Sequence, residues 1–580
     1  MERDSKFLNK AYLKNLFPIL FSVLGGTVNA LVDSIFVSNA IGTDALAAVN
    51  VSMPVYLFIC TCGALLAGGC SVLSAQSAGE DNMKKADRQY KELIFMCVIL
   101  GGAVTLLGVL FCHPISGFLS GGGALSQYVY EYCLVTFIGT IFVMALYIPA
   151  NYLQLDGKNK HISVMFFILI VTDILFDFIF MMIFPFGIFG AALASLVSDV
   201  IACIYGFLAL QLGYSNYKIG FRLPSALKKA LNLGSPQALG NLYDTIKLLV
   251  LNSLILSFYG EGCSAVWAAV NTICEVSLII VLGTARAAFP LTAAFFSSKE
   301  NSGVRILTKL AMKTGIMLSL IFTALITALC IPIKMMFGLS DSMLIPCICV
   351  GISTIVYTVC SIWESCFNAC GSIFISNALS FGRKLIFPIA AALAIAFVHG
   401  TIWLFLPISG VLTILLGLGV TYLYYRKSSR SERPLSRYLL LDDTLERERK
   451  ILDFSIRADV DSVCYASEQI QEFCSENNMS PKYTMRFGLA IEELLNVIIS
   501  KSSDINSIDL RAYAFDGMAG LRIRCFGNNY DPFNDSDSDD DFLMGISMIK
   551  KMADITSHTY TLGMNIINII FPLEKKNDDR

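Results

Sequence analysis

Three aspartates lie in apolar stretches of this chain, where a carboxylate is costly to bury. Asp33 lies in "NALVDSIFVSNAIGTDALAAVN", residues 29–50, and Asp173 and Asp177 lie one helical turn apart in "TDILFDFIF". A charged side chain at membrane depth costs about 3 kcal/mol on insertion scales and normally faces a polar cavity or a partner. Because no lysine or arginine lies near them in the apolar segments of the first half, we expect the three carboxylates to converge and to hold protons or a cation.

Two other interpretations of these aspartates stay open. Asp33 could lie close enough to the outer interface to be hydrated, and Asp173 and Asp177 could accept hydrogen bonds from hydroxyl groups on neighbouring helices. Ionisable residues inside membranes are functional by default, so an ion-coupling role is favoured for the three together.

A second charged set, in the apolar segments of the other half, mixes acids with bases. Asp244 and Lys247 are three residues apart, which predicts a local ion pair. Glu275 and Glu364 need partners from other helices, and a residual negative charge in a central cavity would favour a cationic, amphipathic cargo. We therefore assign these four residues to a predicted substrate cavity.

The composition is that of an integral membrane protein. The 580 residues are 55% hydrophobic and 15% charged, with a mean hydropathy of +0.64. Segments long enough to cross about 30 Å of hydrocarbon recur through residues 1–425, and the first is expected to be its own insertion signal. They predict about 12 helices, over 12–38, 48–77, 93–112, 128–153, 161–184, 188–212, 232–258, 265–296, 306–331, 342–369, 379–399 and 402–425.

Basic residues are concentrated in alternate connections, which predicts the orientation of the chain. Lys84, Lys85 and Arg88 lie in one such connection, and Arg383 and Lys384 are counted in another. By the positive-inside rule these connections and both termini are cytoplasmic. The 18 cysteines lack paired metal spacing and are expected to be small buried hydrophobes or reduced thiols.

A short internal repeat divides the membrane part into halves. "ALAAVN" at 45–50 returns as "VWAAVN" at 266–271, each at the start of a long apolar segment. Two six-helix lobes in parallel orientation, 1–220 and 221–427, would enclose a cavity between them, as in secondary transporters. A linker over 428–450 then leads to a domain of soluble composition, 451–580.

The membrane part resembles the multidrug and toxic compound extrusion (MATE) family of cation-coupled exporters. The resemblance rests on "VDSIFVSNAIGTDALAAVNVSMPV", on "TDILFDFIFMMIFPFGIFGAALAS" and on the duplicated "AAVN", and it covers about 415 residues. It implies that Asp33, Asp173 and Asp177 carry the coupling ion, although the family often has Asn at the position of Asp173.

The last 130 residues or so predict an α/β sandwich. The pattern favours strands at 451–456, 507–515, 520–527, 556–561 and 564–571, with helices over 459–477, 481–500 and 544–553. "LAIEELLNVIISKS" and "FLMGISMIKKMADITSHTYTLGMNIINIIFPL" resemble the GHKL ATP-binding fold of anti-sigma-factor serine kinases. The resemblance implies that Glu492 and Asn496 occupy the base and magnesium positions of the nucleotide site.

Departures from the GHKL pattern predict weak ATP binding. Asn528 and Tyr530 stand where an adenine-binding Asp and a glycine are usual, and Tyr530 would keep backbone from approaching a nucleotide. Gly545 of the phosphate lid is kept, but Leu543 stands where a second glycine is usual. The acidic run "DSDSDDD" would repel a triphosphate unless it held magnesium, and Mg-ATP is therefore not expected as a tight ligand.

These observations predict an all-α polytopic membrane protein with a cytoplasmic α/β tail. The favoured function is an H⁺- or Na⁺-driven antiporter of small organic compounds in the plasma membrane of a bacterium, and a transporter rather than an enzyme. Its expected partners are the small-molecule substrate, the lipid bilayer and a cytoplasmic protein bound by the tail, with no nucleic acid. The alternatives are a lipid-linked flippase, or a membrane sensor with a signalling, kinase-like tail.

Overall fold

The computed structural model describes most of the chain. Some side chains inside the helices also lie outside the described part. The described residues are 5–41, 43–80, 82–120, 125–212, 215–225, 227–336, 342–428, 436, 439, 441, 448, 450, 451–477, 479–501, 507–515, 518–534, 546–547, 549–551, 553 and 555–572.

The first half of the membrane part folds as long helices that match the predicted segments to within a few residues at most ends. The elements are α1 (Ser5–Ala40), α2 (Thr43–Gly79), α3 (Met83–Leu110), α4 (Cys112–Ser120), α5 (Ser126–Leu155), α6 (Asn159–Asp177) with the π-helical turn η1 (Phe178–Ile183), and α7 (Gly187–Gln211). Helices α2, α3, α5, α6 with η1, and α7 each contain an apolar run long enough to cross a bilayer.

The second half repeats this plan. The predicted helices 232–258 and 265–296 are the two parts of α8, which are separated at Gly260, where a φ of 80° and a ψ of −176° are not helical. The elements are α8 (Leu227–Ser297), α9 (Asn301–Ala328), α10 (Cys330–Met336), α11 (Leu344–Ala369), α12 (Ile373–Phe381), η2 (Gly382–Ile386), α13 (Phe387–Phe397), η3 (Ile402–Leu404) and α14 (Phe405–Ser428).

Two features recur in both halves and support an internal repeat. A short helix, α4 or α10, follows the third long helix of each half, and the fifth contains a π-helical turn, η1 at its end in the first half and η2 within it in the second. Ten segments of the described chain are long and apolar enough to span a membrane. The other two predicted helices correspond to α1 and the first part of α8. The predicted all-α polytopic membrane fold is therefore confirmed.

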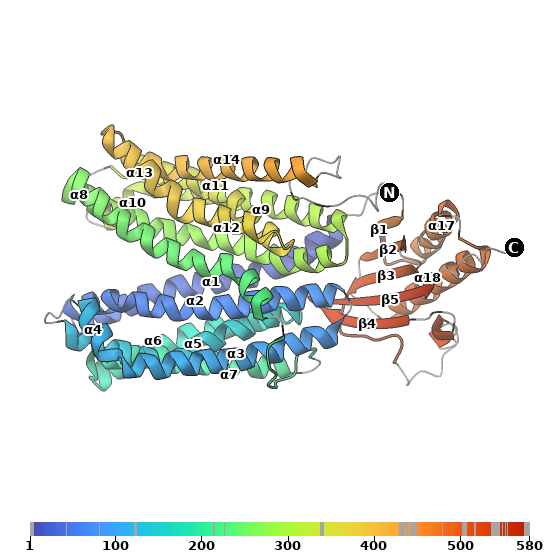
Figure 1. Ribbon diagram of the computed structural model, residues 1–580, viewed down its shortest axis with the longest axis horizontal. Coiled ribbons are helices and arrows are strands. Elements are labelled where there is room, and N and C mark those ends of the chain that lie inside the picture. Colours follow the sequence, from blue (N-terminus) through green and yellow to red (C-terminus); the bar gives the residue numbers. More distant parts are fainter. Residues whose placement is uncertain are drawn as a thin grey trace.

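The helices form two layers, with the C-terminal domain at one end (Figure 1). We call α1–α7 the N-terminal bundle, α8–α14 the C-terminal bundle, and residues 451–572 the tail. The end of the bundles that contacts the tail is the tail end, and the opposite end is the far end.

The tail is one antiparallel sheet with two helices on one face. Its order is β1-β2-β3-β5-β4, and every neighbouring pair is antiparallel. The predicted helix over 544–553 lies partly outside the described residues. The elements are β1 (Ile451–Arg457), α17 (Val460–Glu476), α18 (Pro481–Lys501), β2 (Ser507–Phe515), β3 (Met518–Phe526), β4 (Ile555–Thr561) and β5 (Met564–Pro572).

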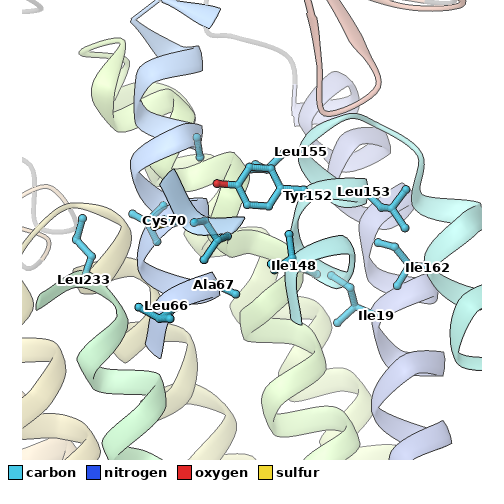
Figure 2. Close-up of a cluster of buried hydrophobic side chains, with 14 of the residues drawn as sticks. Ile19, Leu66, Ala67, Cys70, Ile148, Tyr152, Leu153, Leu155, Ile162 and Leu233 are labelled. Carbon is cyan, nitrogen blue, oxygen red and sulfur yellow. The ribbon is translucent and has the colours of Figure 1, made fainter. Parts of the chain in front are cut away.

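One apolar core joins both bundles to the tail. Tyr152 of α5 lies among side chains of the N-terminal bundle, and Leu233 of α8 lies beside Leu66 of α2 (Figure 2). The same cluster continues to Phe526 and Leu562 of the tail. A separate apolar cluster fills the far half of the C-terminal bundle. Packing between the bundles is thus concentrated at the tail end.

Close contact of α2 with α8 brings the tail ends of the bundles together. A methyl group on Gly69 would overlap the backbone oxygen of Ala230, and one on Gly234 would overlap that of Leu65. Small residues at such crossings let two helix backbones approach closely within a membrane. The tail end of the space between the bundles is therefore closed.

Candidate functional site

The three predicted coupling aspartates meet in the N-terminal bundle. One carboxylate oxygen from each of Asp33, Asp173 and Asp177 lies within 4.8 Å of the other two. Asp173 and Asp177 are buried, and Asp33 is half-buried. Since α1 begins against the tail and Asp33 is 26 residues beyond Phe7, a rise of about 1.5 Å per residue puts the cluster towards the far end.

Local sequence explains why these side chains approach one another. Gly25 lies about two turns before Asp33, and a methyl group there would contact Ile170 Cδ1 at 2.8 Å. Helices α1 and α6 therefore pack closely about two turns from the site, on its tail-end side. The π-helical turn η1 begins directly after Asp177. Such turns are often found at functional sites, because the extra residue changes the direction in which side chains project.

The arrangement stores electrostatic repulsion that a cation or protons would relieve. Two unit charges 4.8 Å apart repel by about 3.5 kcal/mol at an effective dielectric constant of 20. Asp33 Oδ1 and Asp177 Oδ2 are buried and accept no hydrogen bond within the described part of the chain. Oxygen ligands of this kind suit a hard cation such as Na⁺, or a shared proton.

A fourth acid, Asp199 of α7, was not anticipated from the sequence. Its carboxylate is half-buried and close enough to Asp173 to feel its charge. Tyr147 of α5 lies within electrostatic reach of both Asp199 and Arg286 of α8. The run "SLVSDVIAC" carries the same signal as the other three acids, a lone carboxylate in an apolar helix.

In the C-terminal bundle, most of the charged residues predicted to line the substrate cavity form ion pairs. Asp244 lies between Lys247, at 2.7 Å, and Lys384, at 3.1 Å, so the predicted local ion pair is confirmed. Glu364 accepts a hydrogen bond from Arg383 at 2.7 Å. Glu275 is exposed and lies within electrostatic reach of Lys247.

The assignment of Arg383 and Lys384 to a basic loop was wrong. Both residues lie in η2, inside the helical segment Ile373–Phe397 that is apolar enough to span a membrane. Neutralisation by Glu364 and Asp244 explains how two adjacent basic residues are accommodated there.

We expect the Glu364–Arg383 pair to be strongly asymmetric in its response to mutation. Both side chains are largely buried, at 13% and 5% exposure, so Glu364→Ala leaves a buried guanidinium without its partner and should cost about 3–5 kcal/mol. The double variant Glu364→Leu with Arg383→Met should recover most of that loss. Thermal unfolding in detergent compares the two, and a double variant less stable than Glu364→Ala would contradict this account.

The predicted nucleotide residues have different local contacts. Glu492 lines an open groove between α17 and α18, together with Gln471. Asn528 lies in the loop after β3, where its backbone oxygen accepts a hydrogen bond from Asn565 at 2.8 Å. No hydrogen bond among the described residues joins Asn528 to Glu492 or Asn496. Gly545 and Leu543 lie outside the described residues.

The loop that would face a nucleotide is tied to β5 instead. The Tyr530 backbone N–H donates to Asn565 Oδ1 at 3.0 Å, and its ring packs against the apolar core of the tail. A backbone donor that is already satisfied in this way is not available to a phosphate or a base.

Comparison with known proteins relates the membrane part to one transporter family. Residues 18–179 match the MatE family model. The chain is 20% identical over 322 residues to the multidrug export protein MepA of Staphylococcus aureus, covering 55% of this chain and 71% of that protein. It is 22% identical over 296 residues to an FAD transporter of Shewanella oneidensis, covering 49% of this chain and 65% of that protein.

Solved structures agree with this relation at the level of the fold. A MATE protein in complex with MaL6 superposes with a TM-score of 0.67 at 22% identity, covering 73% of this chain and 98% of that chain. An outward-facing MATE family transporter of the MOP superfamily gives 0.67 at 23% identity, covering 73% and 97%. Ten helices of the described chain are apolar enough to span a membrane, residues 18–179 match the MatE model, and the fold is that of solved MATE transporters, so the membrane part is similar to multi-pass transporters of the MATE family.

Proposed function

We propose that this chain exports small amphipathic organic compounds, cationic ones included, in exchange for inward-moving H⁺ or Na⁺. The observation that carries the proposal is the group formed by Asp33, Asp173 and Asp177, because one carboxylate oxygen of each lies within 4.8 Å of the other two. A cation or protons entering from the far end would relieve the repulsion, and release on the other side would reset the site. Membrane depth makes such a group costly unless it binds and releases charge.

The proposed cargo class rests on two acids of the membrane-spanning helices that are not fully buried. Asp199 and Glu275 are partly or fully exposed acids in membrane-spanning helices, whereas Asp244 and Glu364 are neutralised by bases. The relatives named multidrug export proteins support an organic cargo. A lipid-linked flippase would need basic residues to hold a phosphate, and the first bundle offers acids instead.

Flux into inside-out vesicles tests this proposal. Accumulation of a fluorescent organic cation such as ethidium should follow an imposed pH or Na⁺ gradient and should stop when that gradient is collapsed. The gradient that drives uptake identifies the coupling ion. Uptake that is indifferent to both gradients would refute antiport.

We also propose that the tail is a regulatory domain of the GHKL type that has lost tight nucleotide binding. The five-stranded antiparallel sheet with α17 and α18 on one face supports the resemblance in fold. Asn565 hydrogen-bonds both the Tyr530 backbone N–H and the Asn528 backbone oxygen, which supports the proposed loss of nucleotide binding. We place the tail in the cytoplasm, where a cytoplasmic protein could act on it.

Calorimetry of the full-length protein with Mg-ATP should therefore show no micromolar binding. Loss of an acidic acceptor at Asn528 and of two glycines should cost several kcal/mol if each substitution costs about 1–3 kcal/mol, which moves micromolar affinity towards millimolar. Asn496→Ala is the matched control. Micromolar binding that disappears in Asn496→Ala would instead make the tail an active nucleotide-dependent switch.

A further inference from the structure

The tail contacts the membrane part through the face of its sheet that lacks helices. Strand residues alternate between two faces, and on β2 and β3 one face is apolar and packs on α17 and α18. The other face carries Arg511, Arg522 and Arg524, and all three side chains are buried, at 2%, 9% and 4% exposure. A row of buried guanidinium groups requires acids on the opposing surface.

Glu300 supplies the central acid. It is fully buried in the connection between α8 and α9, and its carboxylate accepts hydrogen bonds from Arg522 Nη1 at 3.1 Å and from Arg524 Nη1 at 2.7 Å. Arg511 Nη2 donates to the backbone oxygen of Lys299 at 3.0 Å. We call this contact the Glu300 anchor.

Further contacts extend the Glu300 anchor on both sides. Ser302 Oγ donates to Asp453 of β1 at 2.6 Å, and the Arg524 guanidinium lies 4.7 Å from the ring centroid of Phe295. Asp509 of β2 is also paired with Arg524, at 3.4 Å. With Asp453 and Asp509, the three arginines face three acids, so the buried charges balance.

A second anchor holds the N-terminal bundle. The turn between β4 and β5 reaches the connection between α5 and α6, where the Leu562 N–H donates to the Leu155 backbone oxygen at 2.7 Å and Thr561 Oγ1 donates to the same atom at 2.8 Å. Phe526 of β3 packs on Phe7 of α1, with 4.8 Å between ring centroids, and Lys10 lies over the same ring. We call this contact the Leu155 anchor.

One sheet therefore holds both bundles at the same end. β3 takes part in both anchors, through Arg524 in one and Phe526 in the other, and β5 connects it to the Leu562 turn. Alternating access in such transporters is largely rigid-body rocking of one repeat against the other. A sheet hydrogen-bonded across all its strands cannot stretch, so the tail ends cannot separate while both anchors hold.

We propose that the tail is a latch that fastens the two bundles together and must release the Glu300 anchor before the tail end can open. This inference rests on the proposed alternating-access function. The Glu300 anchor is the one that opens, because its contacts depend on charge, whereas the Leu155 anchor is built from backbone hydrogen bonds and apolar packing continuous with the main core. The connection between α8 and α9 thereby becomes a control point for the transport cycle.

Glu300→Gln tests the latch, with Glu80→Gln as its control. The first variant removes the charge and keeps the shape. The second makes the same change at the tail end of α2, where Glu80 is exposed and pairs with the exposed Lys85, at 3.4 Å. Amide hydrogen exchange of the full-length protein should be at least about tenfold faster in Glu300→Gln in β2, β3, the α8–α9 connection and the tail-end turns of α2 and α8. It should be unchanged in Glu80→Gln.

Glu300→Asp and Ser302→Ala complete the experiment. Glu300→Asp keeps the charge on a shorter side chain and should show an intermediate rate. Ser302→Ala removes the hydrogen bond to Asp453 and leaves Glu300 in place, so it should fold even if Glu300→Gln does not, and it should raise exchange at the same positions by a smaller factor. Unchanged exchange in both Glu300→Gln and Ser302→Ala, or faster exchange in the tail alone, would overturn the latch. Because exchange needs no cargo and no gradient, the latch and the antiport proposal can fail independently.

Discussion

Replacing Asp177 with asparagine will abolish gradient-driven efflux without preventing insertion into the membrane. Asparagine keeps the shape of the side chain but removes the charge that would hold the coupling ion, and it lowers the repulsion of about 3.5 kcal/mol between neighbouring carboxylates 4.8 Å apart. Asp33→Asn should have a weaker effect, because Asp33 is half-buried rather than buried. Vesicle flux under an imposed gradient measures both.

Glu131→Gln is the matched control for these variants. Glu131 lies near the start of α5 in the same bundle and accepts a hydrogen bond from Gln127 at 2.7 Å, so its loss removes an acid outside the cluster. It should transport at the wild-type rate. Wild-type flux in the double variant Asp33→Asn with Asp177→Asn would defeat the assignment of coupling to these residues.

Replacing Gly69 or Gly234 with valine should also stop transport, by a different route. Each side chain would overlap backbone atoms across the crossing of α2 and α8, so the helices must move apart. Overpacking of this kind costs about 1–3 kcal/mol, and every 1.4 kcal/mol shifts a two-state equilibrium tenfold, here away from the state closed at the tail end.

Gly102→Val on α3 is the control, because a methyl group there contacts nothing within 4 Å. Flux and amide exchange at residues 65–69 and 230–234 should change in Gly69→Val and Gly234→Val and stay at wild-type values in the control. Normal flux in both variants would show that the close crossing is not needed for the cycle.

The sequence predicted the local elements well, because their signals are local. Apolar runs of spanning length located the helices, and alternation of apolar residues located the tail strands to within one or two residues. Asp33, Asp173 and Asp177 were found because each is a lone charge in an apolar run. The same reasoning missed Asp199, which lies in an equally clear context.

The contacts that depend on the relative placement of distant segments could not be predicted. Arg383 and Lys384 look like a basic loop until Glu364 and Asp244 are seen to lie beside them. Likewise Arg522 and Arg524 alternate with apolar residues as any solvent-facing strand residues would, and their acid partner Glu300 is more than 200 positions away in the chain. Only the docking of the tail reveals that this face is buried.

The structure tests the predicted fold of the tail but not its predicted nucleotide site. The alternation of strands and helices is confirmed in the described part of residues 451–572. The nucleotide site remains a prediction, since Glu492 and Asn528 depend on ligand contacts, and the acidic run and Gly545 lie outside the described residues. Fold alone does not determine whether such a domain binds ATP.

Ion release on cargo binding tests the central claim most directly. Tetraphenylphosphonium, a lipophilic organic cation, is added to purified protein in weakly buffered solution with a pH indicator, and in parallel to protein equilibrated with labelled Na⁺. The account predicts that binding displaces either protons or Na⁺ from the wild-type protein, and that the displacement is lost in the double variant Asp33→Asn with Asp177→Asn. Binding with neither ion displaced, or with equal displacement in the double variant, would contradict it.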